Sequence, residues 1–263
     1  TISNTNLVGA WSLRKLKNSA VYANKVRRSN DNSAIDIGFS GVNYDTSSLS
    51  THVGANSGFI TAWYDQSGNG FTLSQGTSGN QPIIRSSGTN NVINSKVAIK
   101  GNTTNQASLG GSIGSISTTV LTITIVLSVP AFVTGNRRVV SVNQSGNTDY
   151  GLSSTFNINQ HATNRIMVNQ NTDLTTTLNA NTPSVLTAIW NGSTLKIRIN
   201  GTEVASASNT STIIVNDIDF FGATYSYLEC LISESVLFSR ALNTTELQLL
   251  ERNMGTYYGI TVA

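Results

Sequence analysis

Two carboxylates lie close enough in the sequence to act together. Asp217 and Asp219 are separated by one residue in an Ile- and Val-rich stretch that is typical of a strand. Both side chains are therefore expected on the same face. Like charges at that spacing raise the pKa of one partner, as acid–base catalysis on a glycosidic bond requires. The simpler interpretation, which we favour, is an exposed polar strand face.

A second candidate is the loop Asp65-Gln66-Ser67-Gly68-Asn69-Gly70. It offers one carboxylate, one amide oxygen and several carbonyl oxygens, so Asp65 is a candidate ligand for calcium, which takes six to eight oxygens. The alternative is a turn in which the Asp65 side chain accepts hydrogen bonds from the amides that follow it. We favour the turn, because the loop carries a single formal charge.

The other reactive side chains form no catalytic arrangement. Glu229 and Glu234 are five residues apart, so in one strand they face opposite sides, and Glu234 is expected to anchor Arg240. Cys230 lies among apolar neighbours and is expected to be an inert buried thiol. The sequence has no nucleophile elbow, zinc-ligand spacing or phosphate loop. We therefore assign no catalytic residue and expect no required cofactor.

The composition indicates which elements must position these groups. Of the 263 residues 38% are hydrophobic and only 11% are charged, and Ser, Thr and Asn supply most of the polarity. This composition argues against coiled coils and disorder, and no apolar run reaches the ~18 residues of a membrane-spanning helix. The net charge of +3 gives no basic surface typical of nucleic-acid binding. An all-β protein without a membrane span remains, and we expect one domain over residues 1–263.

Alternating apolar residues predict many short antiparallel strands. The clearest are Leu121–Leu127 and Leu195–Ile199. Asn191-Gly192 and Asn200-Gly201 predict hairpin turns, so residues 185–190, 195–199 and the segment from 204 should form a meander. Residues 13–22 are predicted to be helical or irregular. Asn243 and Glu246 have capping-box spacing for a short C-terminal helix that Gly255 is expected to end.

Two stretches carry a family resemblance. Residues 9–16, 26–32 and 36–39 and the run Trp63-Tyr64-Asp65-Gln66-Ser67-Gly68-Asn69-Gly70 resemble arabinofuranosidase B catalytic-domain-like modules, which also occur in bacterial surface and phage structural proteins. Residues 185–201 and Glu234–Leu242 resemble laminin-G-like, concanavalin-type jelly rolls. The resemblance implies a two-sheet antiparallel jelly-roll sandwich whose concave face or rim loops hold the ligand. The catalytic acids of the arabinofuranosidases map onto no residue here.

These observations together predict a non-catalytic, extracellular or virion-surface module that binds carbohydrate. Trp63 and Trp190 are expected in the core, while Tyr64 and Tyr225 are better placed for exposure. The predicted ligand-binding residues are Tyr64, Asp65, Asn69 and Tyr225. The expected partners are a glycan or cell-surface polysaccharide, and a homo-oligomer or a virion or surface assembly remains open. The alternatives are a structural or decoration protein of a phage particle and a furanosidase-like glycoside hydrolase.

Overall fold

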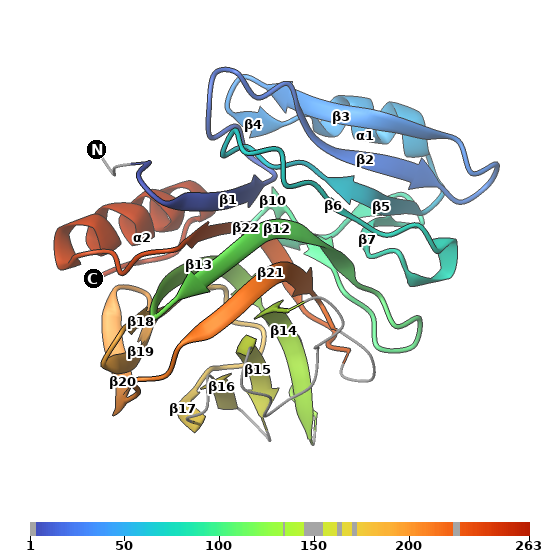
Figure 1. Ribbon diagram of the computed structural model, residues 1–263. Coiled ribbons are helices and arrows are strands. Elements are labelled where there is room, and N and C mark those ends of the chain that lie inside the picture. Colours follow the sequence, from blue (N-terminus) through green and yellow to red (C-terminus); the bar gives the residue numbers. More distant parts are fainter. Residues whose placement is uncertain (1–3, 134, 145–154, 162–164, 170–172, 223–226) are drawn as a thin grey trace.

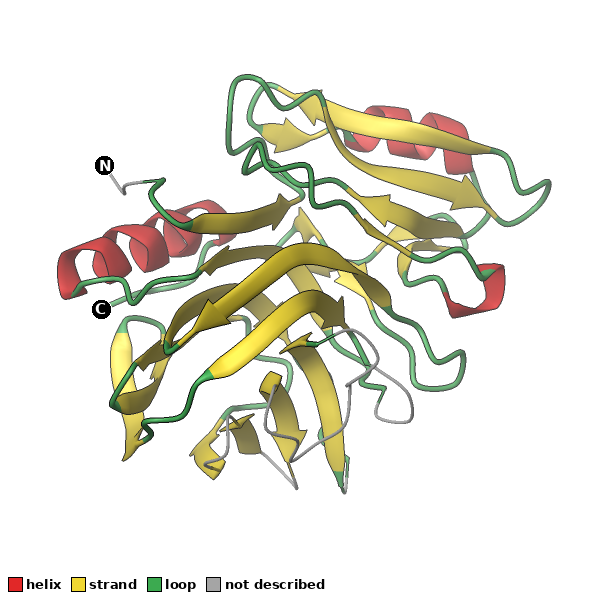
Figure 2. Ribbon diagram, in the orientation of Figure 1, coloured by secondary structure: helices red, strands yellow, loops and turns green. Residues whose placement is uncertain are grey.

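A computed structural model describes residues 4–133, 135–144, 155–161, 165–169, 173–222 and 227–263. Strands dominate these segments (Figure 2). Hydrogen bonds link 20 of the described strands into one curled sheet, in which every pairing between named strands is antiparallel. The sheet folds over on itself to form two facing layers (Figure 1). This arrangement confirms the predicted all-β jelly roll with a short C-terminal helix.

The back layer contains the segments that the sequence predicted best. The predicted meander is confirmed, and Asn200 and Gly201 both have positive φ in the turn between its second and third strands, as an Asn-Gly hairpin requires. In spatial order the layer consists of β1 (Leu7–Ser12), β22 (Leu231–Phe238), β13 (Val120–Ser128), β18 (Ser184–Asn191), β19 (Thr194–Ile199) and β20 (Thr202–Ser208).

The front layer faces the back layer across the main core. Strand β21 lies between β12 and β14, and the remaining strands follow β14 in sequence order. The layer consists of β12 (Leu109–Thr118), β21 (Ile213–Phe220), β14 (Asn136–Asn143), β15 (Thr155–His161), β16 (Arg165–Asn169) and β17 (Asp173–Thr177).

The N-terminal third forms an extension of the sheet at one edge of the two layers. Its strand β6 pairs with β12 of the front layer, and β11 pairs with β22 of the back layer, so the extension contacts both. It consists of β2 (Tyr22–Arg28), β3 (Ala34–Ser40), β4 (Asn43–Tyr44), α1 (Thr46–Val53), β5 (Gly58–Trp63), β6 (Leu73–Ser74), η1 (Ser78–Asn80), β7 (Ile83–Ser86), β8 (Thr89–Asn90), β9 (Val92–Ile93), β10 (Lys96–Val97) and β11 (Ile99–Lys100). Residues 13–21, before β2, are irregular.

All three tryptophans are fully buried in the main core. The rings of Trp11 and Trp63 pack edge-on against Phe220 of β21, with centroids 6.0 and 5.7 Å away. This confirms the expectation that Trp63 and Trp190 are core residues. Trp11 also donates its indole N–H to the Phe71 carbonyl at 2.7 Å, which joins β1 to the Asp65 loop.

Helix α2 (Thr244–Tyr258) covers the outer face of the back layer and forms a second core with it. Strand β13 is consequently buried on both faces, its Thr side chains included. The capping box between Asn243 and Glu246 is present as predicted. The helix continues past Gly255, however, and ends at Gly259, whose φ of 65° is the left-handed conformation that favours glycine. Neither described helix could span a membrane.

Candidate functional site

The outer face of the front layer carries a cluster of polar side chains. In the register, Asp219 of β21 is opposite Ser141 of β14, and Asp217 is opposite Asn143. Asn157 of β15 is on the other side of Ser141. The residues that alternate with them, such as Val142 and Ile218, point into the core. We call this set the front polar cluster: Ser141, Asn143, Asn157, Asn159, Asp217 and Asp219.

Several amides of the front polar cluster are buried without a hydrogen-bond partner. Asn143 and Asn157 are fully buried, and Asn159 is 1% exposed. Within the described part of the chain, neither side-chain polar atom of Asn157 has a partner, and the same holds for Oδ1 of Asn143 and Nδ2 of Asn159. A buried polar atom without a partner costs about 1–3 kcal/mol. Native proteins retain such atoms rarely, so their concentration on one face marks it as a candidate binding site.

Asp219 is the carboxylate at the centre of this face. It is half-buried and accepts a hydrogen bond from Nδ2 of Asn143 at 3.1 Å. Burial raises the pKa of Asp219 to about 6, and the charge of Asp217 adds to the rise, while Asn143 and Arg138 oppose it. The expectation that both aspartates share a face and that one pKa is raised is thus confirmed. The favoured alternative, an exposed polar face, holds only in part, because Asp217 and Asp219 are both half-buried.

Gly110 of β12 makes room for this carboxylate. It is opposite Asp219 in the register, and a Cβ atom at Gly110 would lie 2.0 Å from the Asp219 Oδ1. Any larger residue at this position would displace the Asp219 side chain. The residue pattern alone did not indicate a functional role for Gly110, Ser141, Asn143, Asn157 or Asn159. Asn157 and Asn159 alternate with Phe156 and Ile158, and this alternation is the one sequence feature that could have placed them on the face opposite the core.

Tyr64, predicted to bind ligand, lies on the N-terminal extension. Its hydroxyl donates to Asp36 of β3 at 2.5 Å, and its ring centroid is 6.5 Å from that of Tyr22. Tyr64 is half-buried, whereas Tyr22 is 47% exposed. Burial and the neighbouring Asp36 raise the pKa of the Tyr64 hydroxyl. The two rings and one carboxylate form a small aromatic surface patch, and a ligand-binding role for Tyr64 stays a prediction.

Asp65 organises the turn that follows it. Its Oδ1 accepts from the backbone N–H groups of Ala10 and Ser67 at 2.9 and 2.7 Å. Its Oδ2 accepts from the Ser67 hydroxyl at 2.6 Å and from the N–H groups of Gly70 and Phe71. These contacts are those expected of a turn in which the Asp65 side chain accepts from the residues that follow it. Calcium binding at Asp65 stays a prediction, supported if calcium added after chelator treatment raises the Tm and contradicted if it does not.

The side chain of Asn69, like that of Asp65, makes hydrogen bonds to the backbone of β1. Its Nδ2 donates to the carbonyls of Leu7 and Val8, each at 2.8 Å, and so holds the loop against β1. Asp65 and Asn69 therefore lie together, whereas the hydroxyl of Tyr64 is directed to β3. Tyr225, the fourth predicted ligand-binding residue, lies outside the described residues. Among the residues that the structure describes, no group of three His, Cys, Asp or Glu side chains could hold a metal ion.

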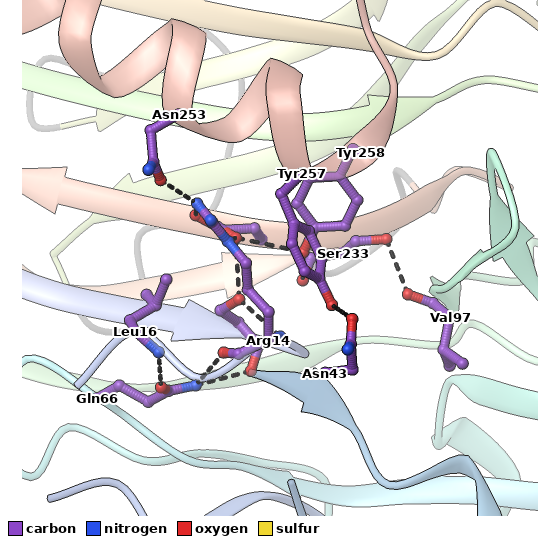
Figure 3. A network of polar contacts seen from close by, with 11 residues as sticks. Arg14, Leu16, Asn43, Gln66, Val97, Ser233, Asn253, Tyr257 and Tyr258 are labelled. Carbon is purple, nitrogen blue, oxygen red and sulfur yellow. Dashed lines mark hydrogen bonds and ion pairs between the residues drawn. The ribbon is translucent and has the colours of Figure 1, made fainter. Parts of the chain in front are cut away.

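A buried ion pair lies between β1, β22 and α2 (Figure 3). Glu234 accepts from Nε and Nη2 of Arg14 at 2.6 and 2.9 Å, and from the hydroxyls of Ser12 and Tyr258. A pocket of about 250 Å³ opens beside the pair. The expectation that Glu234 anchors Arg240 is wrong. Arg240 instead pairs with Glu246 in the first turn of α2, at 2.7 Å.

Cys230 is fully buried, and burial raises the pKa of its thiol. Both observations fit the expected inert core residue. Within the described residues, Cys230 lies in the main core, away from the front polar cluster.

Comparison with solved structures fixes the fold. The chain superposes on an arabinofuranosidase complexed with arabinofuranosyl-α-1,2-xylobiose with a TM-score of 0.74 and 16% identity, over 94% of this chain and 62% of the other. It also superposes on the binding domain of botulinum neurotoxin serotype G, with a TM-score of 0.57 and 18% identity, over 73% of this chain and 49% of the other. The chain has a concanavalin-like jelly-roll fold.

The same fold occurs in a further solved structure. A botulinum neurotoxin DC binding domain in complex with SialylT matches with a TM-score of 0.53 and 13% identity, over 73% of this chain and 48% of that one. No family model matches the sequence, and no curated protein matches it. The chain spans less than two thirds of the length of the arabinofuranosidases, and identities this low establish the concanavalin-like fold alone.

Proposed function

We propose that the protein is a carbohydrate-binding module whose ligand binds at the face that carries the front polar cluster. The observation that carries the proposal is the set of unpaired buried amides on Asn143, Asn157 and Asn159, beside the carboxylate of Asp219. Sugar hydroxyls both donate and accept hydrogen bonds, and amides do the same. A carboxylate can in addition accept a charge-assisted hydrogen bond from a hydroxyl. The fold, shared with carbohydrate-binding domains and an arabinofuranosidase, supports this assignment.

A glycan array tests the proposal. Wild-type protein is expected to bind at least one neutral glycan, and Asn157→Leu is expected to lose that binding, because leucine fills a similar volume without a polar atom. Thr202→Val, a change on the exposed edge strand β20, is the matched control and should bind as the wild type does. An array without hits, or hits that Asn157→Leu retains in full, would contradict the proposal.

A second candidate function is hydrolysis of a furanoside. It is favoured by the pKa of about 6 at Asp219, because a general acid must carry a proton near neutral pH, and Asp217 is the adjacent carboxylate. Hydrolysis of an aryl arabinofuranoside that disappears in Asp219→Asn, while glycan binding remains, would establish it. Glycan binding without hydrolysis of the aryl arabinofuranoside would support the non-catalytic module that we propose first.

The proposal includes a location at a cell or particle surface. Ser, Thr and Asn supply most of the polarity, and the edge strand β20 is largely exposed, which suits a module presented outside the cell. Accessibility of the native protein to an externally added protease tests the location. Light scattering of the purified protein tests whether copies associate.

A further inference from the structure

A groove beside α2 is lined by cationic side chains and other hydrogen-bond donors. It lies between α2, the turn joining β3 to β4, and β10, and has a volume of about 710 Å³. This volume is within the range of about 300–1,000 Å³ for small-ligand sites. Arg252, Asn253 and Thr256 share one face of α2, since they are three and four residues apart. We define the α2 groove by Arg14, Asn43, Lys96, Arg252, Asn253 and Thr256.

The α2 groove is positively charged. Three of its residues are cationic, and no Asp or Glu of the described chain lines it. Glu234 pairs with Arg14 and also accepts from the hydroxyls of Ser12 and Tyr258, so the net positive charge of the α2 groove comes from Lys96 and Arg252. Lys96 Nζ lies 4.3 Å from the ring centroid of Tyr257, which holds the ammonium group over the groove wall.

The amides of the groove are oriented so that their NH₂ groups are available. Asn43 Oδ1 accepts from Lys96 Nζ at 3.1 Å and from the Tyr257 hydroxyl at 3.0 Å. Asn253 Oδ1 accepts from Arg14 Nη2 at 2.6 Å, a contact visible in Figure 3. Because ammonium and guanidinium groups only donate, the oxygen of each amide must face the cation. Within the described chain, neither Nδ2 group donates to a protein acceptor.

The guanidinium groups add further donors. Arg252 uses Nε on the Ala263 carbonyl, and its two Nη groups meet no acceptor in the described residues. Arg14 uses Nε and Nη2, and its Nη1 has no acceptor among the same residues. Apart from the hydroxyls of Thr256 and Tyr257, the polar side-chain groups that the α2 groove offers are therefore donors. Such a surface matches a ligand that is rich in acceptors and negatively charged.

We propose that the α2 groove binds an anionic saccharide through its carboxylate or sulfate group. A saccharide fits better than an acidic peptide, because the N–H groups of a peptide backbone would face a donor-lined wall and lose their hydrogen bonds. Sugar hydroxyls can accept from Asn43, Asn253 and Thr256 while their own hydrogens turn to solvent. The site is separate from the front polar cluster, since α2 covers the back layer and the cluster lies on the outer face of the front layer (Figure 1).

Isothermal titration with trigalacturonate at low salt tests the proposal, with neutral galactotriose as the matched ligand. Wild-type protein should bind trigalacturonate at least about tenfold more tightly than galactotriose, and added salt should weaken the binding. Lys96→Gln/Arg252→Gln should lose about tenfold or more in affinity. The control variant Lys25→Gln/Lys196→Gln removes two positive charges outside the groove, and it should change the affinity for trigalacturonate by less than about twofold.

Four outcomes would overturn the proposal. These are no binding of trigalacturonate, an equal loss in both double variants, equal affinity for tri-glutamate, or full competition by sulfate at the same concentration as trigalacturonate. Equal loss would mean attraction by net charge, tri-glutamate would indicate a peptide site, and sulfate would indicate a site for a simple anion. Asn157→Leu should leave trigalacturonate binding unchanged, so failure at this groove is distinguishable from failure of the proposed function.

Discussion

Asn143 donates from Nδ2 to Oδ2 of Asp219 at 3.1 Å, across the strand pair β14 and β21. The same amide has its oxygen buried without a partner in the described chain. One side chain of the cluster thus stabilises the carboxylate and at the same time leaves an acceptor unused. The front polar cluster therefore combines order with unmet hydrogen-bonding capacity, the combination expected of the sugar site that we propose.

Asp219→Asn is expected to flatten the pH dependence of stability. Since burial raises the pKa of Asp219 from 3.8 to about 6, the native state binds this proton more tightly than the unfolded state. The resulting stabilisation is fully present below the unfolded pKa and is lost as pH rises through about 6. Between about pH 3.5 and about pH 7, the wild type should lose on the order of 2 kcal/mol relative to the variant. Urea titrations that give parallel pH profiles for the two proteins would contradict this account.

Asn157→Leu is expected to increase the free energy of unfolding. The wild-type side chain is fully buried, and neither of its polar atoms has a partner in the described chain. Replacing it with an apolar group of similar volume removes a desolvation cost of about 1–3 kcal/mol. A gain of about 1 kcal/mol in chemical denaturation would agree with the structure. A loss of stability would show that Asn157 has a structural partner.

Gly110→Ala is expected to weaken glycan binding through Asp219. The added Cβ would lie 2.0 Å from the Asp219 Oδ1, so the carboxylate must leave its position. Gly76→Ala is the matched control, since no heavy atom lies within 4 Å of a Cβ there. Affinity for an array-identified glycan should fall by about tenfold or more in the first variant, and stay unchanged in the second. Equal affinities of Gly110→Ala and wild type for the glycan would show that Asp219 does not contribute to binding.

Glu234→Gln is expected to be strongly destabilising. It leaves the guanidinium of Arg14 buried without its carboxylate, since the two side chains are 10% and 1% exposed. Removing one partner of such a pair typically costs about 3–5 kcal/mol. Glu229→Gln breaks the exposed pair with Lys100 and should cost less than about 1 kcal/mol. Thermal unfolding that ranks the two variants equally would contradict the importance of the buried pair.

The sequence predicted the strand-rich fold because its alternation and Asn-Gly turns act locally. The meander from Ser184 to Ser208 and the capping box of α2 follow from such local rules. The partner of Glu234 could not be predicted in this way, since Arg14 is 220 residues away and only the pairing of β1 with β22 brings them together. The same applies to the front polar cluster, which depends on the register of strands β14, β15 and β21.

The predicted site residues illustrate the same limit. Asp65 and Asn69 have the residue types of a binding loop, but their hydrogen bonds are made to β1 and to the turn itself. Sequence proximity grouped Tyr64 with them, whereas the structure directs its hydroxyl to Asp36. Asn157 and Asn159 gave little signal in a chain so rich in Asn. Burial without a partner, which distinguishes them, is visible only in three dimensions.

The most direct test of the central claim is titration calorimetry of one array-identified neutral glycan against wild type and Asn157→Leu. We expect measurable binding to the wild type and a loss of about tenfold or more in the variant, which should be at least as stable as the wild type. Loss of binding would then reflect the missing amide and not unfolding. Equal affinity of the two proteins for the glycan would contradict a ligand site at the front polar cluster.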